Sequence, residues 1–153
     1  MQKSIGLTLI IAILCGLAIG TQSSLNSASG KLTGAVLTGL LVNFLGGMAA
    51  GVILMGIYLR RGGGVFTGIH GTTLWIMIAA GLLGIGIITG IAYALPKIGV
   101  AAGLSAIIAG QMVVALIVDT LGIAGGEPIP LTSIRIAGIG LLTLGTWALL
   151  YKK

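Results

Sequence analysis

Charged side chains are scarce in this chain, and acidic side chains are the scarcest. Lysine, arginine, aspartate and glutamate make up 7% of the 153 residues, with eight bases and two acids. A soluble domain carries about a quarter charged residues. Hydrophobic residues make up 57% of the chain, so there is too little polar surface to cover a water-soluble globule. We therefore expect one membrane domain, residues 1–153, with the lipid bilayer as its solvent.

Residue types that carry catalytic and metal chemistry are also nearly absent. The single cysteine, Cys15, lies in an apolar run and has no partner for an internal disulfide, so we interpret it as a small packed residue. The chain contains no paired carboxylates, no cluster with metal-ligand spacing and no phosphate-binding loop. The sequence thus predicts a protein that is not an enzyme and that uses neither a metal nor a cofactor.

The formal net charge of +6 does not indicate nucleic-acid binding. The basic residues occur singly or in pairs beside apolar runs, whereas a nucleic-acid site would gather them into a stripe. Lysine and arginine placed beside apolar runs are typical of the flanks of membrane helices. We therefore expect anionic lipid headgroups, and no nucleic acid, as partners of these side chains.

Continuous apolar runs predict an all-α fold with five membrane-spanning helices. Each run approaches or exceeds the roughly 20 residues that cross hydrocarbon as a helix, and none alternates as a transmembrane strand would. A short turn is expected at Pro96-Lys97, so that all three prolines fall in connections. Longer loops are expected at about 62–72 and 122–133. The expected spans are about 4–26, 33–59, 73–95, 98–121 and 134–150.

The first run has an alternative interpretation as a cleavable signal peptide. Lys3, the apolar residues 5–19 and the small residues of Ala18-Ile19-Gly20 resemble the three regions of such a peptide. Small residues at that spacing are common by chance in a glycine-rich run. We therefore interpret the run as the first span, and the charge balance described next survives either way.

Basic residues flank the spans equally on the two sides of the membrane. With the amino end on side A, side A carries Lys3, Arg60, Arg61 and Arg135, and side B carries Lys31, Lys97, Lys152 and Lys153. An excess of Lys and Arg on one side normally fixes orientation. Without that excess, the chain is expected to insert both ways up and to pair with an antiparallel copy of itself.

The odd number of spans leads to the same expectation. The two ends of the chain lie on opposite sides of the membrane, and no convincing repeat occurs within it. Transporters with inverted repeats place their sites near the midplane, where two inverted halves meet. The second half of a ten-helix bundle would then come from another chain, either an antiparallel copy or an oppositely oriented relative.

Glycine is the most conspicuous small residue, with 28 copies. Helices in lipid associate by close backbone approach, which pairs of small residues four positions apart permit. Such pairs predict a tight bundle, although some are expected by chance in so glycine-rich a chain. The helix-packing candidates are Gly16, Gly20, Gly47, Gly51, Gly86, Gly90, Gly99 and Gly103.

Five polar residues within or at the ends of spans are candidates for a substrate pathway. Polar groups in hydrocarbon usually face a partner or a water-filled cavity. Gln111 lies near the centre of the fourth span, and helix-to-helix bonding is its alternative role. Asn43 could serve packing alone, Gln22 and Asn26 could be a wetted helix end, and Asp119 could be a solvated residue that closes its helix. The sharper hypothesis for Asp119 is a carboxylate at the mouth of the pathway.

Several segments resemble the YdcZ-like family of small bacterial inner-membrane proteins, in the drug/metabolite transporter superfamily. The resemblance covers essentially the whole chain and rests on order and spacing. It is carried by Gln22–Asn26, Leu41–Gly46, Gly99–Ala102, Gly110-Gln111 and Leu116–Asp119. It implies a multi-pass inner-membrane transporter or exporter of a small solute, working as a dual-topology homodimer or as an oppositely oriented pair. It implies no known substrate.

Two departures and two rival functions accompany the resemblance. Related small multidrug transporters use a glutamate in their first span, which this chain lacks, so proton-coupled export of cationic drugs is not expected. Leu41–Gly47 also resembles the second span of dual-topology fluoride channels, but those proteins have four spans. An ion channel and a membrane scaffold without transport are therefore the alternatives to a transporter.

Overall fold

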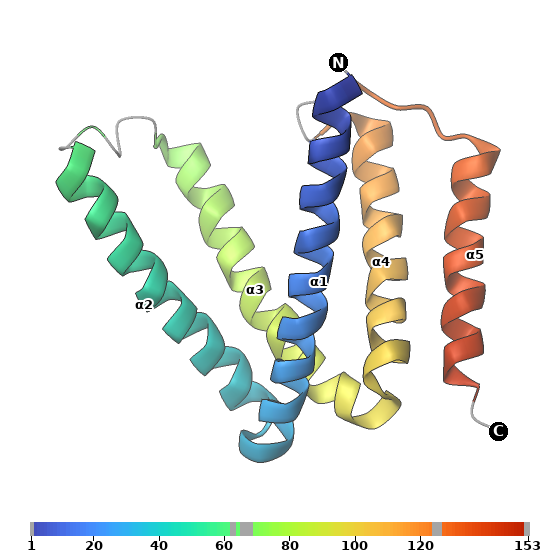
Figure 1. Cartoon of the computed structure of the whole chain (residues 1–153), viewed down its shortest axis with the longest axis horizontal. Coiled ribbons are helices and arrows are strands. Elements are labelled where there is room, and N and C mark those ends of the chain that lie inside the picture. Colours follow the sequence, from blue (N-terminus) through green and yellow to red (C-terminus); the bar gives the residue numbers. More distant parts are fainter. Residues whose placement is uncertain (1, 62–63, 65–68, 124–126, 152–153) are drawn as a thin grey trace. The chain divides into compact units, whose positions relative to one another are not determined.

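Five long α-helices make up the part of the chain that the structure describes. The computed structural model describes residues 2–61, 64, 69–123 and 127–151, with side chains from residue 5 onward. Each helix is long and apolar enough to cross a membrane, which confirms the expected all-α fold with five spanning helices (Figure 1). The helices are α1 (Gln2–Thr33), α2 (Ala35–Arg61), α3 (Gly71–Ile98), α4 (Val100–Leu121) and α5 (Ser133–Leu150).

Some expected features lie outside the described residues. Lys152 and Lys153 of the charge balance are among them, as are parts of both expected loops, residues 62–63, 65–68 and 124–126. The side chain of Lys3 is not described either.

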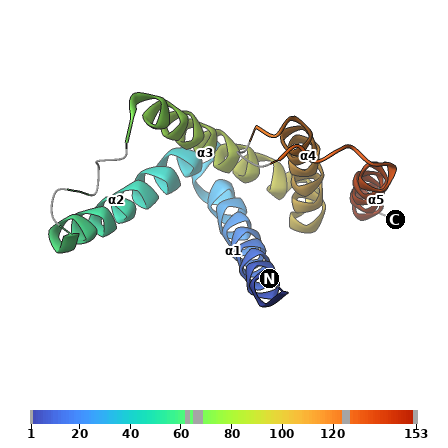
Figure 2. The ribbon, with the colours of Figure 1, turned by 90° about the horizontal axis from the view of Figure 1, so that it is seen from above.

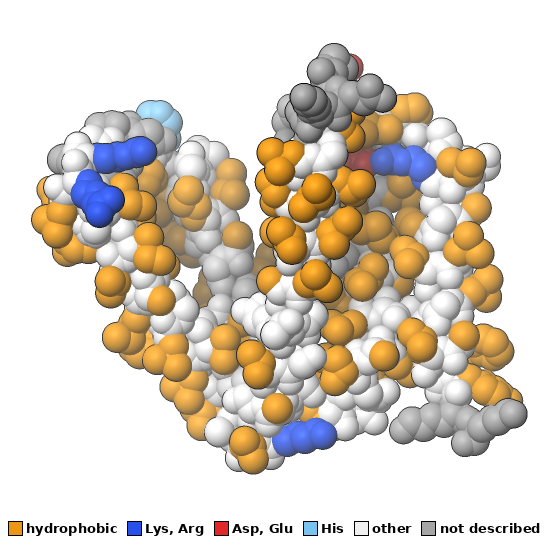
Figure 3. Space-filling model, viewed as in Figure 1, with side chains coloured by type: hydrophobic (Ala, Val, Ile, Leu, Met, Phe, Trp, Pro, Cys, Tyr) orange, Lys and Arg blue, Asp and Glu red, His pale blue; other side chains and the backbone are white. Residues whose placement is uncertain are grey.

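Large hydrophobic side chains are exposed along all five helices. In the space-filling view they spread over the helices, whereas the Lys and Arg side chains occur at helix ends (Figure 3). A water-soluble protein rarely exposes large contiguous apolar patches. This distribution is that of helices surrounded by lipid.

The chain divides into two compact units, which are described separately. Residues 21–93 form the α2–α3 unit, which also includes the second half of α1. Residues 1–20 and 94–153 form the α4–α5 unit. The boundaries fall within α1 and α3, so each of these two helices contributes to both units.

A tight turn joins α1 to α2 in the α2–α3 unit. Gly34 has φ of +85°, a conformation that residues with a Cβ rarely adopt. Three hydroxyl groups brace the turn. Thr33 Oγ1 donates to the Ser29 carbonyl over 3.1 Å and lies 2.9 Å from Thr38 Oγ1, which in turn donates to Ser29 Oγ over 3.4 Å. Thr38 is 1% exposed, so this network lets a polar residue be buried at low cost.

Helices α2 and α3 approach one another through small residues. Gly39 of α2 faces Thr89 of α3 with no room for a Cβ between them, and a Cβ on Gly84 would lie 3.2 Å from Asn43 Oδ1. Beyond these contacts the two helices diverge toward the connection between Arg61 and Gly71 (Figures 1 and 2). The close approach is therefore confined to the first part of α2.

The turn between α3 and α4 differs from the sequence expectation. Pro96 and Lys97 were expected to form the turn, but α3 continues through both residues to Ile98, with Pro96 inside the helix. The chain turns at Gly99 instead, where φ is +89°. Gly99 N–H still donates to the Leu95 carbonyl over 2.9 Å, so the last turn of α3 closes despite the proline. The expectation was wrong because the glycine, which alone tolerates this φ, decides where the helix ends.

The first helix also extends further than expected, to Thr33 instead of about residue 26. The polar residues after Gly20 were interpreted as the end of the span, yet they lie in continuous helix.

In the α4–α5 unit, Leu95 packs against Gly103, where a Cβ would lie 2.7 Å from Leu95 Cδ1. Helices α4 and α5 are extensively in contact and run in opposite directions (Figure 1).

Candidate functional site

Asp119 lies in the last turn of α4, where the chain leaves the helix. Gly122, with φ of +65°, ends α4 in a left-handed conformation, and the Ile123 N–H donates to the Val118 carbonyl over 3.3 Å. This glycine-based C-cap satisfies carbonyl groups that the helix end would leave free. The Asp119 carbonyl also accepts from the Ile129 N–H over 2.9 Å. The connection to α5 is thus attached to the backbone of Asp119 itself.

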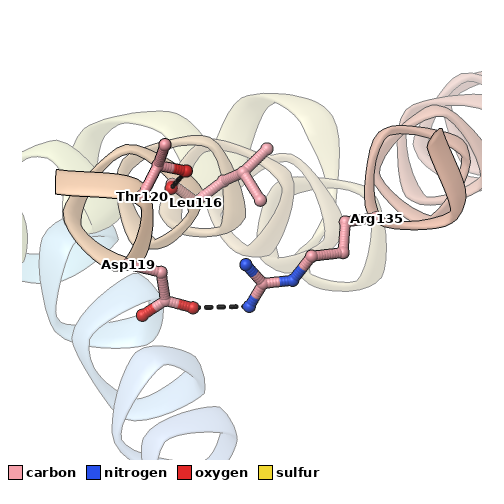
Figure 4. A network of polar contacts seen from close by, with 4 residues as sticks. All are labelled: Leu116, Asp119, Thr120 and Arg135. Atoms are coloured by element: carbon pink, nitrogen blue, oxygen red, sulfur yellow. Dashed lines mark hydrogen bonds and ion pairs between the residues drawn. The ribbon is translucent and has the colours of Figure 1, made fainter. Parts of the chain in front are cut away.

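The Asp119 side chain forms an ion pair with Arg135 in the first turn of α5. Arg135 Nη2 donates to Asp119 Oδ2 over 2.6 Å (Figure 4). The Asp119 side chain is 39% exposed and the Arg135 side chain is 30% exposed. The negative C-terminal end of α4 disfavours the Asp119 carboxylate and favours the Arg135 guanidinium, and the positive N-terminal end of α5 favours Asp119 and disfavours Arg135. Each charge is therefore unfavourable at the end of its own helix and is stabilised by its partner.

A hollow of about 260 Å³ lies beside this ion pair, between α4 and α5. Its walls are apolar apart from the two charged side chains. The lining residues are Met112, Ala115, Leu116, Asp119, Arg135, Gly138, Ile139 and Leu142. Few convergent polar groups in an apolar concavity are typical of sites for small organic molecules.

Each member of the ion pair retains unused hydrogen-bonding capacity. Within the described residues, Arg135 Nη1 is the buried side-chain nitrogen or oxygen atom that lacks a hydrogen-bond partner. The contact of Asp119 with Arg135 uses Oδ2, and in Figure 4 the other carboxylate oxygen points away from the guanidinium. An unpaired buried donor is costly, because it has lost water without gaining a partner. The hollow is lined by one cationic and one anionic side chain that lie close together.

A second hollow of about 570 Å³ follows along the same two helices. It shares Gly138 and Leu142 with the first and reaches Ser105 and Thr146, so the α4–α5 face is hollowed over much of its length. The Ser105 and Thr146 hydroxyls donate to carbonyls one turn earlier in their own helices, at 2.9 Å each. Their polarity is thus satisfied, and the second hollow presents an almost wholly apolar surface.

Gln111 lies on α4, two turns before Asp119, but it does not line either hollow. It is near the middle of this 22-residue helix and is exposed. Its carboxamide has no hydrogen-bond partner among the residues that the structure describes. A carboxamide can donate two hydrogen bonds and accept two, and hydrocarbon supplies none.

The other three pathway candidates belong to the α2–α3 unit. Asn43 is half-buried, and its Nδ2 donates to the Gly39 carbonyl over 2.8 Å, while its oxygen faces Gly84 of α3. Asn26 is 4% exposed and lies on the buried face of α1 with Ser23 and Ser27. Gln22, one turn earlier, is exposed. Asn43 thus contacts α3. Gln22 and Asn26 lie in different environments, the first exposed and the second buried. Gln111 and Asp119 share helix α4 but do not line a common hollow.

The glycines that make close contacts within the subunit are mostly not the predicted ones. Close contacts occur at Gly30, Gly39, Gly84 and Gly103, of which Gly103 was a candidate. An added Cβ at the other seven candidates would meet no atom within 4 Å among the described residues, and Gly99 is required for its positive φ. A packing role for Gly16, Gly20, Gly47, Gly51, Gly86 and Gly90 therefore stays a prediction.

Arg135 is the site residue that the sequence interpretation missed. It was counted only as a flanking charge, although an acid closes the fourth span and a base opens the fifth. Opposite charges at the ends of consecutive antiparallel helices are the signal that pairs them. No three His, Cys, Asp or Glu side chains are grouped as metal ligands within the described ranges.

Comparison with known proteins identifies one family. The family model described as "Putative inner membrane exporter, YdcZ" matches residues 7–148 of this chain. No curated protein and no solved structure matches it. The matched range includes α2, α3 and α4 completely, most of α1 and α5, and both members of the Asp119–Arg135 pair.

Proposed function

The chain belongs to the YdcZ family of inner-membrane exporters and is a multi-pass inner-membrane protein, and we propose that it exports a small solute by alternating access. The exporting unit is an antiparallel pair of identical five-helix subunits, related by a twofold axis in the membrane plane. Exchange of conformation between the two inverted halves converts an inward-open state into an outward-open one.

The exposed carboxamide of Gln111 is the observation that carries this proposal. It lies at mid-helix between the apolar residues 106–110 and 112–118 of α4, and lacks a partner among the described residues of its own subunit. A polar side chain in that position needs another helix or water. An in-plane twofold axis keeps mid-membrane residues at mid-membrane, so Gln111 of a second copy can meet the first. Asp119, near a helix end, would occur once at each face.

Glycines on three helices support a second copy as the partner. On α1, α2 and α3, three GxxxG pairs have open space around an added Cβ: Gly16 and Gly20, Gly47 and Gly51, and Gly86 and Gly90. Between helices in lipid, such positions permit close backbone approach. Because Lys and Arg flank the spans in equal number on the two sides, the chain can insert in both orientations.

Two measurements test the proposal. In a Cys15→Ser background, the single cysteine of Glu127→Cys should react with a membrane-impermeant maleimide from both sides of the membrane. Labelling from one side alone in a homogeneous preparation would exclude the antiparallel homodimer. An oppositely oriented relative would then have to supply the other half.

The second measurement is flux into reconstituted vesicles. Uptake from a panel of small solutes should saturate, and Gln111→Ala should reduce it at least about tenfold, as loss of a buried polar contact predicts. Thr143→Ala is the matched control, because its hydroxyl is already bonded to the Ile139 carbonyl of its own helix at 3.0 Å. Non-saturating flux that ignores Gln111→Ala favours a channel, and no flux of any solute favours a scaffold.

A further inference from the structure

We infer that the hollow beside Asp119 and Arg135 binds a small zwitterion with an apolar body, the chemistry of an aliphatic α-amino acid. The inference rests on the proposed export function in one respect, since it names this ligand as the exported solute. The binding site itself follows from the geometry of α4 and α5 alone.

The charges of the site select the head group. Arg135 and Asp119 both line the hollow, and their side chains are 30% and 39% exposed, respectively. A ligand carboxylate accepts from an exposed N–H of the guanidinium, and a ligand ammonium donates to the carboxylate of Asp119, each in a charge-assisted hydrogen bond. The pair is neutral as a whole, so a zwitterion leaves the site neutral. A plain anion or a plain cation would add an uncompensated charge where hydrocarbon and helix ends make charge expensive.

The remaining walls select the body of the ligand. Met112, Leu116, Ile139 and Leu142 line the hollow, and they offer apolar contact without hydrogen bonds. A volume of about 260 Å³ accommodates a small molecule. The second hollow continues from Gly138 and Leu142, so a longer apolar tail also has room to extend along α5.

The site also links the ligand to the contact between the two helices. Arg135 lines the hollow and forms the ion pair with Asp119, so ligand binding and the contact between α4 and α5 involve the same guanidinium.

Binding to the full-length chain in lipid nanodiscs tests the inference with three ligands that share one tail. Leucine carries both charges, 4-methylpentanoate lacks the ammonium, and 3-methylbutylamine lacks the carboxylate. Leucine should bind at least about tenfold more tightly than either analogue, because each removes one charge-assisted hydrogen bond. Equal affinity for leucine and 4-methylpentanoate would overturn the zwitterion site, and so would a lack of binding by all three.

Substitutions locate the site. Asp119→Asn should reduce the preference for leucine over 4-methylpentanoate to less than about threefold, and Arg135→Gln should do the same for leucine over 3-methylbutylamine. Thr120→Ala is the control: Thr120 neighbours Asp119, but its hydroxyl is bonded to the Leu116 carbonyl at 2.7 Å and it does not line the hollow (Figure 4). A preference that survives both substitutions places binding elsewhere and overturns the inference. If the variants do not fold, the three ligands on the unaltered chain still decide.

Flux measurements separate this inference from the proposed function. Leucine binding without leucine flux in vesicles supports the site and counts against export. Saturable, Gln111-dependent flux of another solute, with no preference for leucine in binding, supports export and overturns the zwitterion site.

Discussion

Gly30 of α1 lies directly against the backbone carbonyl of Ala92 in α3, and a Cβ at position 30 would come within 2.5 Å of that oxygen. Four residues after Ala92 comes Pro96, which has no N–H to offer the Ala92 carbonyl. The proline thus leaves a buried acceptor without its helical donor, and the glycine lets another helix cover it closely. Contacts of Cα–H with a carbonyl are weakly favourable and recur where helices pack this closely.

Replacing Gly30 with alanine should destabilise the protein, even though alanine is the better helix former. Alanine at an open helical position gains up to about 1 kcal/mol over glycine, but forced overpacking costs about 1–3 kcal/mol. Thermal unfolding in detergent measures the net effect. Gly6→Ala is the control, since nothing lies within 4 Å of its added Cβ. Equal stability of the two variants would contradict the close packing of α1 on α3.

Two glycines of α2 should separate packing within a subunit from packing between subunits. Gly39 faces Thr89 without space for a side chain, whereas Gly47 has open space. Gly39→Leu should therefore lower the unfolding temperature of the subunit. Gly47→Leu should leave that temperature nearly unchanged and reduce the dimer fraction, as read by subunit energy transfer in liposomes at graded dilution. An unchanged dimer fraction for Gly47→Leu would exclude this position from the subunit interface.

The ion pair between Asp119 and Arg135 should show energetic coupling. Asp119→Asn and Arg135→Gln should each lower stability, because each leaves a charge at an unfavourable helix end. The double variant should lose less than the sum of the two losses. For a partly exposed pair the expected coupling is about 1 kcal/mol, measured as a double-mutant cycle of unfolding free energies. Strict additivity would show that the contact contributes nothing to stability.

The orientation of the chain in the membrane should respond to single changes of charge beside the spans. Glu127→Lys adds a positive charge on side A, and Leu32→Lys adds one on side B beside Lys31. The two variants should shift the orientation in opposite directions, because the side richer in Lys and Arg stays in the cytoplasm. Single-cysteine labelling gives the two fractions. Glu127→Gln is the control that removes the acid alone and should leave the fractions close to those of the parent chain.

The elements of the fold could be predicted from the sequence, but the contacts among them could not. Long apolar runs are sufficient to identify five helices, because hydrocarbon forces every backbone group into an internal hydrogen bond. The ends were less certain. Pro96 suggested a turn, whereas Gly99 makes it, because a proline near a helix end removes one hydrogen bond while a positive φ ends the helix outright.

The candidate site shows the same division. Asp119 was recognisable as the acid of the fourth span, and its position near a helix end followed from its distance to Gln111. Its partner Arg135 was missed. The opposite charges at the two helix ends indicate a candidate pair, but whether they meet depends on how the connection returns to α4. The Ile129 N–H bonds to the Asp119 carbonyl and brings the start of α5 beside the end of α4. A tertiary hydrogen bond of this kind leaves no periodic pattern in the sequence.

The length of α1 gives bilayer thickness a direct influence on this protein. Its 32 residues span about 48 Å, against about 30 Å of hydrocarbon. Tilt alone would have to reach about 50°, beyond the roughly 0–40° that membrane helices adopt. Its apolar part, residues 5–20, covers only about 24 Å. The acyl chains therefore reach into the polar stretch that begins at Thr21, and each ångström of added thickness moves the water boundary closer to Asn26.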